Sequence, residues 1–211
     1  MRDEETGSYW QQVTGAAVAG PLKGSHLTLL PQDELSFALW KKEQPNGTVL
    51  APLPRYAADY EPATWEDRIG KMPTVIHGKK GSLADRDTII GVANGEVAQA
   101  YPLTKLTAQS PVLLDVVGDE PIILVLGPDK KSVRVFSRQV AGRTLEFYGH
   151  SAANANDPWT LVDDATLSGW TFEGCAVSGE MKGQCLTQIY ALKDYWFDWQ
   201  HYHPQSSVYR H

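Results

Sequence analysis

The sequence predicts a mainly β protein of the α+β class, built as antiparallel meander or barrel-like repeats that are each closed by a short tryptophan-bearing helix. Three observations support this prediction. The chain contains an internal repeat, glycine-marked turns separate its apolar runs, and two short aromatic segments each end at a proline. The repeat is the strongest of the three, because it compares the chain with itself.

Residues 15–49 align without gaps on residues 174–208, and 11 of the 35 positions are identical. Unrelated sequences of average composition would match at about two positions. With one residue of slip, Thr6, Ser8 and Trp10 also meet Thr166, Ser168 and Trp170. The glycine-rich stretch 14–24 therefore matches residues 173–183, and its glycines indicate a duplicated hairpin turn. It lacks the spacing of a phosphate-binding loop.

Three further hairpins are expected between residues 87 and 150. Asn94-Gly95 and Gly118-Asp119 each separate two apolar runs, which is a typical hairpin pattern. Ala141-Gly142 separates two runs in which apolar and polar residues alternate, as in half-buried strands. Each pair of runs is predicted to form an antiparallel hairpin around its turn.

The segment 194–204 changes from β-like to helical character. Asp194 is in a position to cap a helix that places Tyr195, Trp199 and Tyr202 on one face and that ends at Pro204. The first copy has an equivalent segment, residues 33–45, with Phe37 and Trp40. Most of these aromatic side chains are expected in the core.

The domain organisation follows from the repeat. Residues 1–50 form the C-terminal half of a first repeat, 51–86 a connector rich in proline and aromatic residues, and 87–211 a complete second repeat, all within one compact unit. The connector holds four prolines, and Tyr56, Tyr60 and Trp65 are expected to pack against the body. A long β-like region precedes only the second copy, so we interpret the chain as N-terminally incomplete.

Composition excludes several classes of function. The net charge of −6 and the absence of a basic run argue against nucleic-acid binding. No apolar run approaches the roughly 20 residues of a membrane span, and no signal peptide is visible in this chain. No motif indicates a cofactor, and no catalytic residues can be assigned from spacing.

Cys175 and Cys185, the two cysteines, lie on either side of the second-copy turn. If the turn is centred near Glu180 they are opposite each other, at a distance that a disulfide can bridge. We expect a disulfide if the protein is exported, and two buried thiols otherwise.

Two other sets of residues are candidate sites. His201 and His203 could offer imidazoles to a metal, completed by His150, His211 or Asp163-Asp164, although residues i and i+2 of a helix point about 200° apart. Surface or capping histidines are the alternative. Trp159 and Tyr195 have no aromatic counterpart in the first copy, which makes them candidates for exposed ligand-binding residues.

The motifs DEETGSYWQQVTGAAVAGPLKG, IIGVANGEVAQAYPL, VFSRQVAGRTLEF and DYWFDWQHYHP resemble, in this order, the bacterial and archaeal family called domain of unknown function 3179 (DUF3179). The resemblance covers nearly the whole chain and implies a periplasmic or extracellular location. Members carry a Cys-Pro-x-Cys type segment before the V-F-x-R strand. Gly127 and Lys130 occupy the two thiol positions here, so that chemistry is not carried over.

These observations favour a non-catalytic structural or binding module of an exported protein, with a protein or a glycan as its partner. One alternative is an accessory redox or metal-handling protein whose reactive cysteines lie in a missing N-terminal part. The other is a carbohydrate-binding domain lined by aromatic residues.

Overall fold

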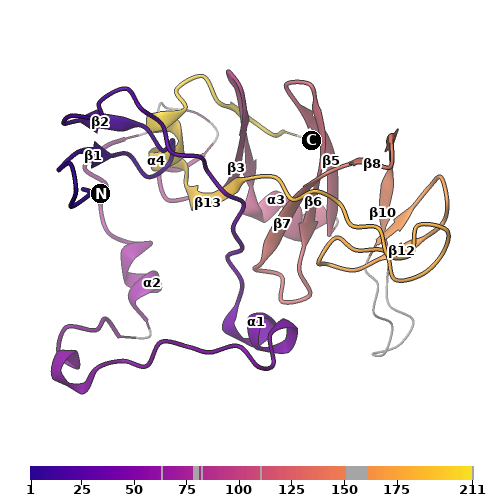
Figure 1. Ribbon diagram of the computed structural model, residues 1–211, viewed down its shortest axis with the longest axis horizontal. Coiled ribbons are helices and arrows are strands. Elements are labelled where there is room, and N and C mark those ends of the chain that lie inside the picture. Colours follow the sequence, from indigo (N-terminus) through magenta and orange to yellow (C-terminus); the bar gives the residue numbers. More distant parts are fainter. Residues whose placement is uncertain (63, 78–80, 82, 110, 151–160, 211) are drawn as a thin grey trace.

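The protein is built from two central β-sheets that pack face to face, with smaller elements covering both outer faces (Figure 1). The computed structural model describes residues 1–62, 64–77, 81, 83–109, 111–150 and 161–210. The first central sheet has the order β13-β3-β4-β14, and the second has the order β5-β6-β7. Their bounds are β3 Thr88–Asn94, β4 Val97–Pro102, β13 Ala191–Tyr195, β14 Ser207–Val208, β5 Val112–Val117, β6 Glu120–Leu126 and β7 Val133–Ser137.

Strand β6 lies at the centre of the fold, because both of its faces are covered. Its apolar run alternates between two cores: Ile122 and Leu124 face the first central sheet, whereas Ile123 and Val125 face the opposite side. A strand buried on both faces needs an almost continuous apolar sequence, which PIILVL provides. The inner core between the two sheets contains Ile90, Val92, Tyr101, Leu106, Leu113, Val117, Ile122, Leu124 and Val135.

The outer face of the β5-β6-β7 sheet is covered by short strands and an irregular hairpin. These strands are β8 Gln139–Val140, β9 Arg143–Thr144, β10 Phe147–Gly149, β11 Leu161–Asp163 and β12 Gly169–Trp170. The fully buried indole of Trp170 meets Phe147 edge to face, with ring centroids 5.5 Å apart. Such a contact stabilises by about 0.5–1.5 kcal/mol beyond the area buried. Together with Phe136, these strands form an outer core on this side of the sheet, which also contains Phe172 and Met181.

The outer face of the other sheet is covered by helix α4 and an N-terminal hairpin. Helix α4 (Trp196–Tyr202) buries Trp196 and Trp199 against the sheet, and Val13 of the hairpin joins the same cluster. Strand β3 has a glycine at the contact: a Cβ atom on Gly91 would lie 2.4 Å from the Trp199 ring. Only glycine lets the indole approach the strand this closely. The hairpin strands are β1 Tyr9–Trp10 and β2 Ala17–Ala19.

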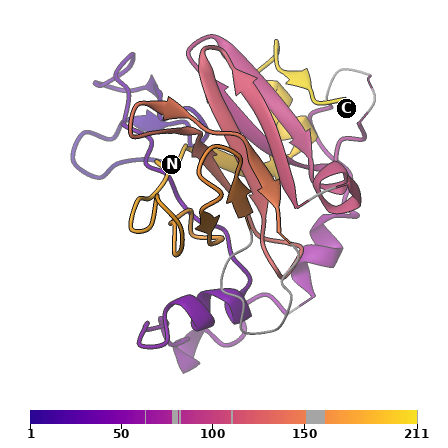
Figure 2. The same ribbon diagram turned by 90° about the vertical axis from the view of Figure 1, so that its right-hand side faces the viewer.

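The remaining helices lie at the edges of this stack. Helix α1 (Phe37–Glu43) is joined to the N-terminal hairpin by a long extended segment, and it stands with α2 (Trp65–Ile69) below the central strands (Figure 2). Its Leu39 is buried in the same core as Trp170. A 3₁₀ turn η1 (Pro54–Tyr56) precedes α2, and helix α3 (Leu103–Gln109) follows β4.

All three expected hairpin turns are confirmed, although the turn at Ala141-Gly142 joins only the short strands β8 and β9. Strands β3 and β4 pair from Ile89–Pro102 to Asn94–Val97, and Gly95 in the turn has φ 57°. Strands β5 and β6 pair from Val112–Val125 to Val117–Glu120, with Gly118 and Asp119 as the turn. In both hairpins the glycine occupies the left-handed conformation that L-residues rarely adopt.

Four expectations about the fold are corrected. The sheets described here are small and open, so the barrel-like closure is wrong. The hairpin at Ala141-Gly142 comprises only β8 and β9, because β7 pairs with β6 instead. The residue that caps α4 is Tyr195, whereas Asp194 and Tyr195 belong to β13. The connector aromatics Tyr56, Tyr60 and Trp65 are 44%, 49% and 43% exposed, so they do not pack into the body.

Two turns, 160 residues apart, contain the same set of hydrogen bonds. The Asp3 carboxylate accepts from the Thr6 amide at 2.6 Å and from Trp10 Nε1 at 2.8 Å. The corresponding bonds to Asp163, from the Thr166 amide and from Trp170 Nε1, are 2.7 and 2.9 Å long. In each turn the serine two residues before the tryptophan accepts from a later amide: Ser8 from Leu22 and Ser168 from Met181.

One glycine in each glycine-rich stretch, Gly20 in the first and Gly179 in the second, is required by its contact with the serine of the turn. A Cβ atom on Gly179 would lie 2.4 Å from Ser168 Oγ, and one on Gly20 would lie 2.6 Å from Ser8 Cα. Both glycines also have positive φ, 80° and 96°. The backbone at Gly20 and Gly179 passes so close to the serine that a side chain would not fit. This explains why glycine occupies both positions without any ligand.

Candidate binding cavity

A cavity of about 550 Å³ opens between the N-terminal hairpin and the segment that runs from β13 into α4. One wall comes from residues 11–15 and 27–30, and the other comes from Tyr190, Leu192, Asp194 and Asp198. The volume lies within the usual range of small-molecule pockets, about 300–1,000 Å³. Aliphatic side chains line much of it, namely those of Val13, Leu27, Leu29, Leu30 and Leu192.

Asp194 and Asp198 bring two carboxyl groups together in the wall of this cavity. Asp194 lies in β13 opposite Ile89, and Asp198 is in the first turn of α4. The Tyr195 amide donates to Asp194 Oδ1 at 2.7 Å, whereas the buried Oδ2 atom has no hydrogen-bond partner within the described part of the chain. Burial, together with the neighbouring carboxyl groups of Asp198 and Glu34, raises the pKa of Asp194 to about 7.

The simplest way to satisfy the buried oxygen is a proton shared between Asp194 and Asp198. A carboxyl group in such a pair keeps a proton at a pH where an isolated one would be ionised. Near pH 7 the pair then carries between one and two negative charges, and Asp194 can donate a hydrogen bond to Asp198 or release its proton. An incoming cation would favour release, because it stabilises the second carboxylate.

Two neighbours adjust the charge around this pair. Burial, and then the charge of Asp194, raise the pKa of the Tyr190 phenol, so that group stays a neutral hydrogen-bond donor. Lys193 Nζ lies 2.5 Å from Glu34 Oε1 and is thereby paired with another acid. Lys193 also lines the cavity, but its ammonium group is paired with Glu34, whereas Asp194 and Asp198 face each other.

The stability of the fold is expected to depend on pH through Asp194. The folded pKa of about 7 exceeds the unfolded value of 3.8, so the folded state binds the extra proton. Stability from this group is therefore full below about pH 4, falls as the pH rises to 7 and is then constant. The loss is about 2 kcal/mol after solvent screening is allowed for.

Urea unfolding from pH 4 to 9 measures this dependence, with Asp194→Asn as the comparison. The variant should remove the fall between pH 4 and 7, since it has no proton to lose. If the free energy of unfolding of the wild type changed with pH in the same way as that of the variant, the raised pKa of Asp194 would be contradicted. Asp198, Glu34, Tyr190 and Lys193 face the same region and are left unchanged in both proteins.

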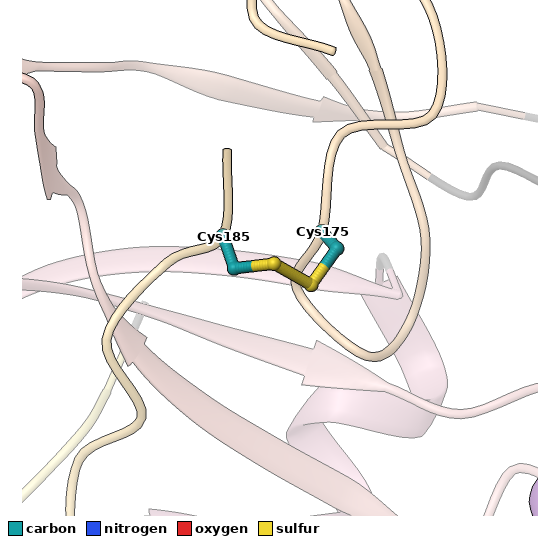
Figure 3. Close-up of a disulfide and its surroundings, with 2 residues drawn as sticks. All are labelled: Cys175 and Cys185. Atoms are coloured by element: carbon teal, nitrogen blue, oxygen red, sulfur yellow. A yellow bond between two sulfur atoms is a disulfide. The ribbon is translucent and has the colours of Figure 1, made fainter. Parts of the chain in front are cut away.

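The structure joins Cys175 and Cys185 in a disulfide across the turn at residues 179–183 (Figure 3). The two residues also form an isolated antiparallel bridge, as do Ala16 and His26 in the N-terminal hairpin. The crosslink spans ten residues. A bond closing a loop of this size stabilises by about 2–3 kcal/mol.

A thiol titration of unreduced protein under denaturing conditions should detect no free thiol, and the same titration after reduction should detect two. This follows because the chain has two cysteines and both are in the disulfide. Two titratable thiols in protein that was never exposed to reductant would contradict the pairing.

The two candidate histidines contact different aromatic neighbours. The His203 ring lies 4.0 Å from the Trp199 ring, centroid to centroid, and burial lowers the pKa of His203. His201 is exposed and meets Tyr202 edge to face. Among the described residues no group of three His, Cys, Asp or Glu side chains could hold a metal. His211 lies outside them, so the metal site stays a prediction.

Of the two candidate ligand-binding aromatics, Tyr195 is among the described residues. Trp159 lies outside the described residues. Tyr195 stacks on Phe197, with centroids 6.3 Å apart, and the Arg86 guanidinium lies 4.9 Å from the Tyr195 ring. Its face is therefore already used in a contact within the chain.

Sequence reasoning missed the role of Asp194 and Asp198 altogether. Asp194 was expected to cap the helix, and Asp198 carried no expectation. A pair of acids four residues apart near an aromatic helix is a usable signal, but it is common on solvated helix faces. This pair differs from such solvated acids because the N-terminal hairpin, more than 160 residues away in the sequence, forms the opposite wall of its cavity.

The fold and the cavity together define a β-rich protein of two packed sheets with a carboxyl-lined pocket on one outer layer. The model of the family described as protein of unknown function (DUF3179) matches residues 1–206, and the chain belongs to this family. No curated protein and no solved structure matches the chain. Within the described residues, no helix combines the length and the apolar character needed to cross a membrane.

Proposed function

We propose that the chain is a non-catalytic binding module that holds a protonated amine on an aliphatic chain in the cavity beside Asp194. The observation that carries this proposal is the Asp194 carboxyl group: the residue lines the cavity, and its buried Oδ2 atom has no hydrogen-bond partner among the described residues. Once Asp194 has released the proton that it shares with Asp198, its buried carboxylate lacks a donor, which costs about 1–3 kcal/mol, and a ligand that donates a hydrogen bond recovers that cost. The aliphatic walls suit the carbon chain behind the ammonium group.

The proposal is tested with n-butylamine as the probe. Binding measured by calorimetry at pH 6 is expected in the millimolar range, and Asp194→Asn should weaken it about tenfold, since a charge-assisted hydrogen bond is lost. Glu96→Gln is the matched control, because Glu96 is an exposed acid in the β3–β4 turn, away from the cavity lining. Equal affinities for the wild type and Asp194→Asn would contradict the assignment.

We also infer that the protein works outside the cytoplasm. The Cys175–Cys185 disulfide supports this location, because such bonds persist mainly in oxidising compartments. The thiol titration described above tests it: free thiols in protein isolated from its native compartment without reductant would remove the support.

The proposed module contains two diverged copies of one unit. Support comes from the matched Asp3 and Asp163 turns, which are offset by 160 residues, and from the two helices, which are offset by 159. Helices α1 and α4 both span seven residues, and their C-cap residues have nearly the same dihedral angles, φ −121° and ψ 67° at Gln44 against φ −122° and ψ 69° at His203. Neither the redox nor the glycan-binding alternative has comparable support among the described residues: the redox alternative depends on cysteines other than Cys175 and Cys185, which are paired with each other, and the Tyr195 ring already contacts Arg86.

A further inference from the structure

Helix α1 has an exposed aromatic face that its counterpart α4 keeps buried. In α4, Trp196 and Trp199 are 3% and 1% exposed. In α1, the corresponding Phe37 is 62% exposed, and it stacks on Trp40 with ring centroids 5.7 Å apart. An open cavity of about 640 Å³ lies beside these two rings, next to Gly47 and Arg134.

The structure shows what covers the equivalent face of α4. Strands β3 and β4 form a hairpin that lies between β13, which precedes the helix, and β14, which follows it. The hairpin pairs antiparallel with β13 and parallel with β14. Gly91 of the hairpin leaves the space that the Trp199 ring fills.

The segments that flank α1 correspond to β13 and β14 but have no strand partner among the described residues. Subtracting the offset of 159 places residues 32–36 at β13 and residues 48–49 at β14. Neither segment belongs to a described strand; the Ser36 amide donates to Ser132 Oγ at 3.1 Å, and Val49 is 63% exposed. An unpaired extended edge beside an apolar helix face is a typical site for strand addition.

We propose that the face formed by Phe37, Trp40 and residues 32–36 and 48–49, the α1 face, binds an antiparallel β-hairpin of a partner polypeptide. The partner strand next to residues 32–36 carries a glycine opposite Trp40, as β3 carries Gly91 opposite Trp199. This inference rests on the proposed duplication and is independent of the amine-binding cavity.

The bound hairpin has a defined orientation. Its first strand runs antiparallel to residues 32–36, and its second strand runs parallel to residues 48–49, as β3 and β4 do around α4. The side chains of Asp33 and Glu43 are already held by Arg134, so the partner adds main-chain hydrogen bonds and apolar contacts instead of a new ion pair. Main-chain pairing then supplies affinity, and the glycine opposite the indole supplies specificity.

The test adds such a hairpin to the full chain. Residues 86–103, which contain β3 and β4, are fused a second time to the protein through a flexible Gly/Ser linker, which raises the local concentration of the hairpin to the millimolar range. Amide hydrogen exchange at residues 32–35 and 48–49 should slow about tenfold. The matched control carries leucine in place of the added copy of Gly91, and it should show no slowing.

Two results would overturn the proposal. Equal exchange in the glycine and leucine fusions would show that the α1 face does not accept the hairpin. Protection that appears without any fusion and grows with protein concentration would show that a second copy of the chain covers this face. A Trp40→Ala variant of the glycine fusion should lose most of the protection, which separates the α1 face from the site already occupied beside Trp199.

Discussion

Asp163→Ala is expected to lower the free energy of unfolding by about 3–5 kcal/mol, the largest effect of any single substitution considered for this chain. The Asp163 side chain is fully buried and accepts hydrogen bonds from the amides of Thr166 and Ser168, from the Thr166 hydroxyl and from Trp170 Nε1. Alanine leaves these donors buried without an acceptor, and each costs about 1–3 kcal/mol before the site relaxes.

Asp3→Ala is the matched comparison, because Asp3 accepts the same set of bonds in the N-terminal turn. That turn is more open to solvent, so water can replace the lost acceptor and the loss of stability should be clearly smaller. Urea unfolding of both variants gives the two values. A loss below 1 kcal/mol for Asp163→Ala would show that the turn does not hold the outer layer.

Arg134→Met is expected to cost about 3 kcal/mol and to release α1 from the body. The Arg134 guanidinium is 7% exposed, donates to Asp33 Oδ2 at 2.6 Å and to Glu43 Oε2 at 2.8 Å, and lies 4.5 Å from the Phe172 ring. Burial opposes the charge of Arg134, but bonds to Glu43 and Asp33 outweigh it and raise its pKa above the ordinary value. Methionine fills the space and leaves both acids without their cation.

Arg143→Met is the control for this change, because its pair with Glu180 is exposed and 3.6 Å long. Exposed pairs contribute about 0–1 kcal/mol, so this variant should unfold almost as the wild type does. Adding Glu43→Gln to Arg134→Met should recover part of the loss, which a double-mutant cycle measures. Equal losses for the two arginine variants would contradict the role assigned to the buried guanidinium.

The parts of the fold that could be predicted from sequence are those governed by local chemistry. Asn94-Gly95 and Gly118-Asp119 marked their hairpins because few residues adopt the backbone angles of tight turns. The spacing of Cys175 and Cys185 around a glycine-rich turn likewise indicated that they could meet. In each case, the relevant residues lie within a dozen positions of one another.

The predictions that failed concern features that depend on which distant segments pair with each other. The alternation in residues 133–147 was correctly β-like, but it could not reveal that β7 would pair with β6 and leave only a two-residue ladder at Ala141-Gly142. Asp194 is a residue type that often caps helices, yet pairing with β3 extends strand β13 through Tyr195. The cavity could not be predicted because its two walls come from opposite ends of the chain.

The central claim is that the Asp194–Asp198 pair holds a proton that an amine displaces. The most direct measurement is the number of protons released per n-butylamine bound, obtained by calorimetry in buffers of different ionisation enthalpy. With the pKa of Asp194 near 7, release should approach one proton per amine at pH 6 and vanish at pH 9. Binding without proton release at pH 6, or no binding at all, would contradict the account.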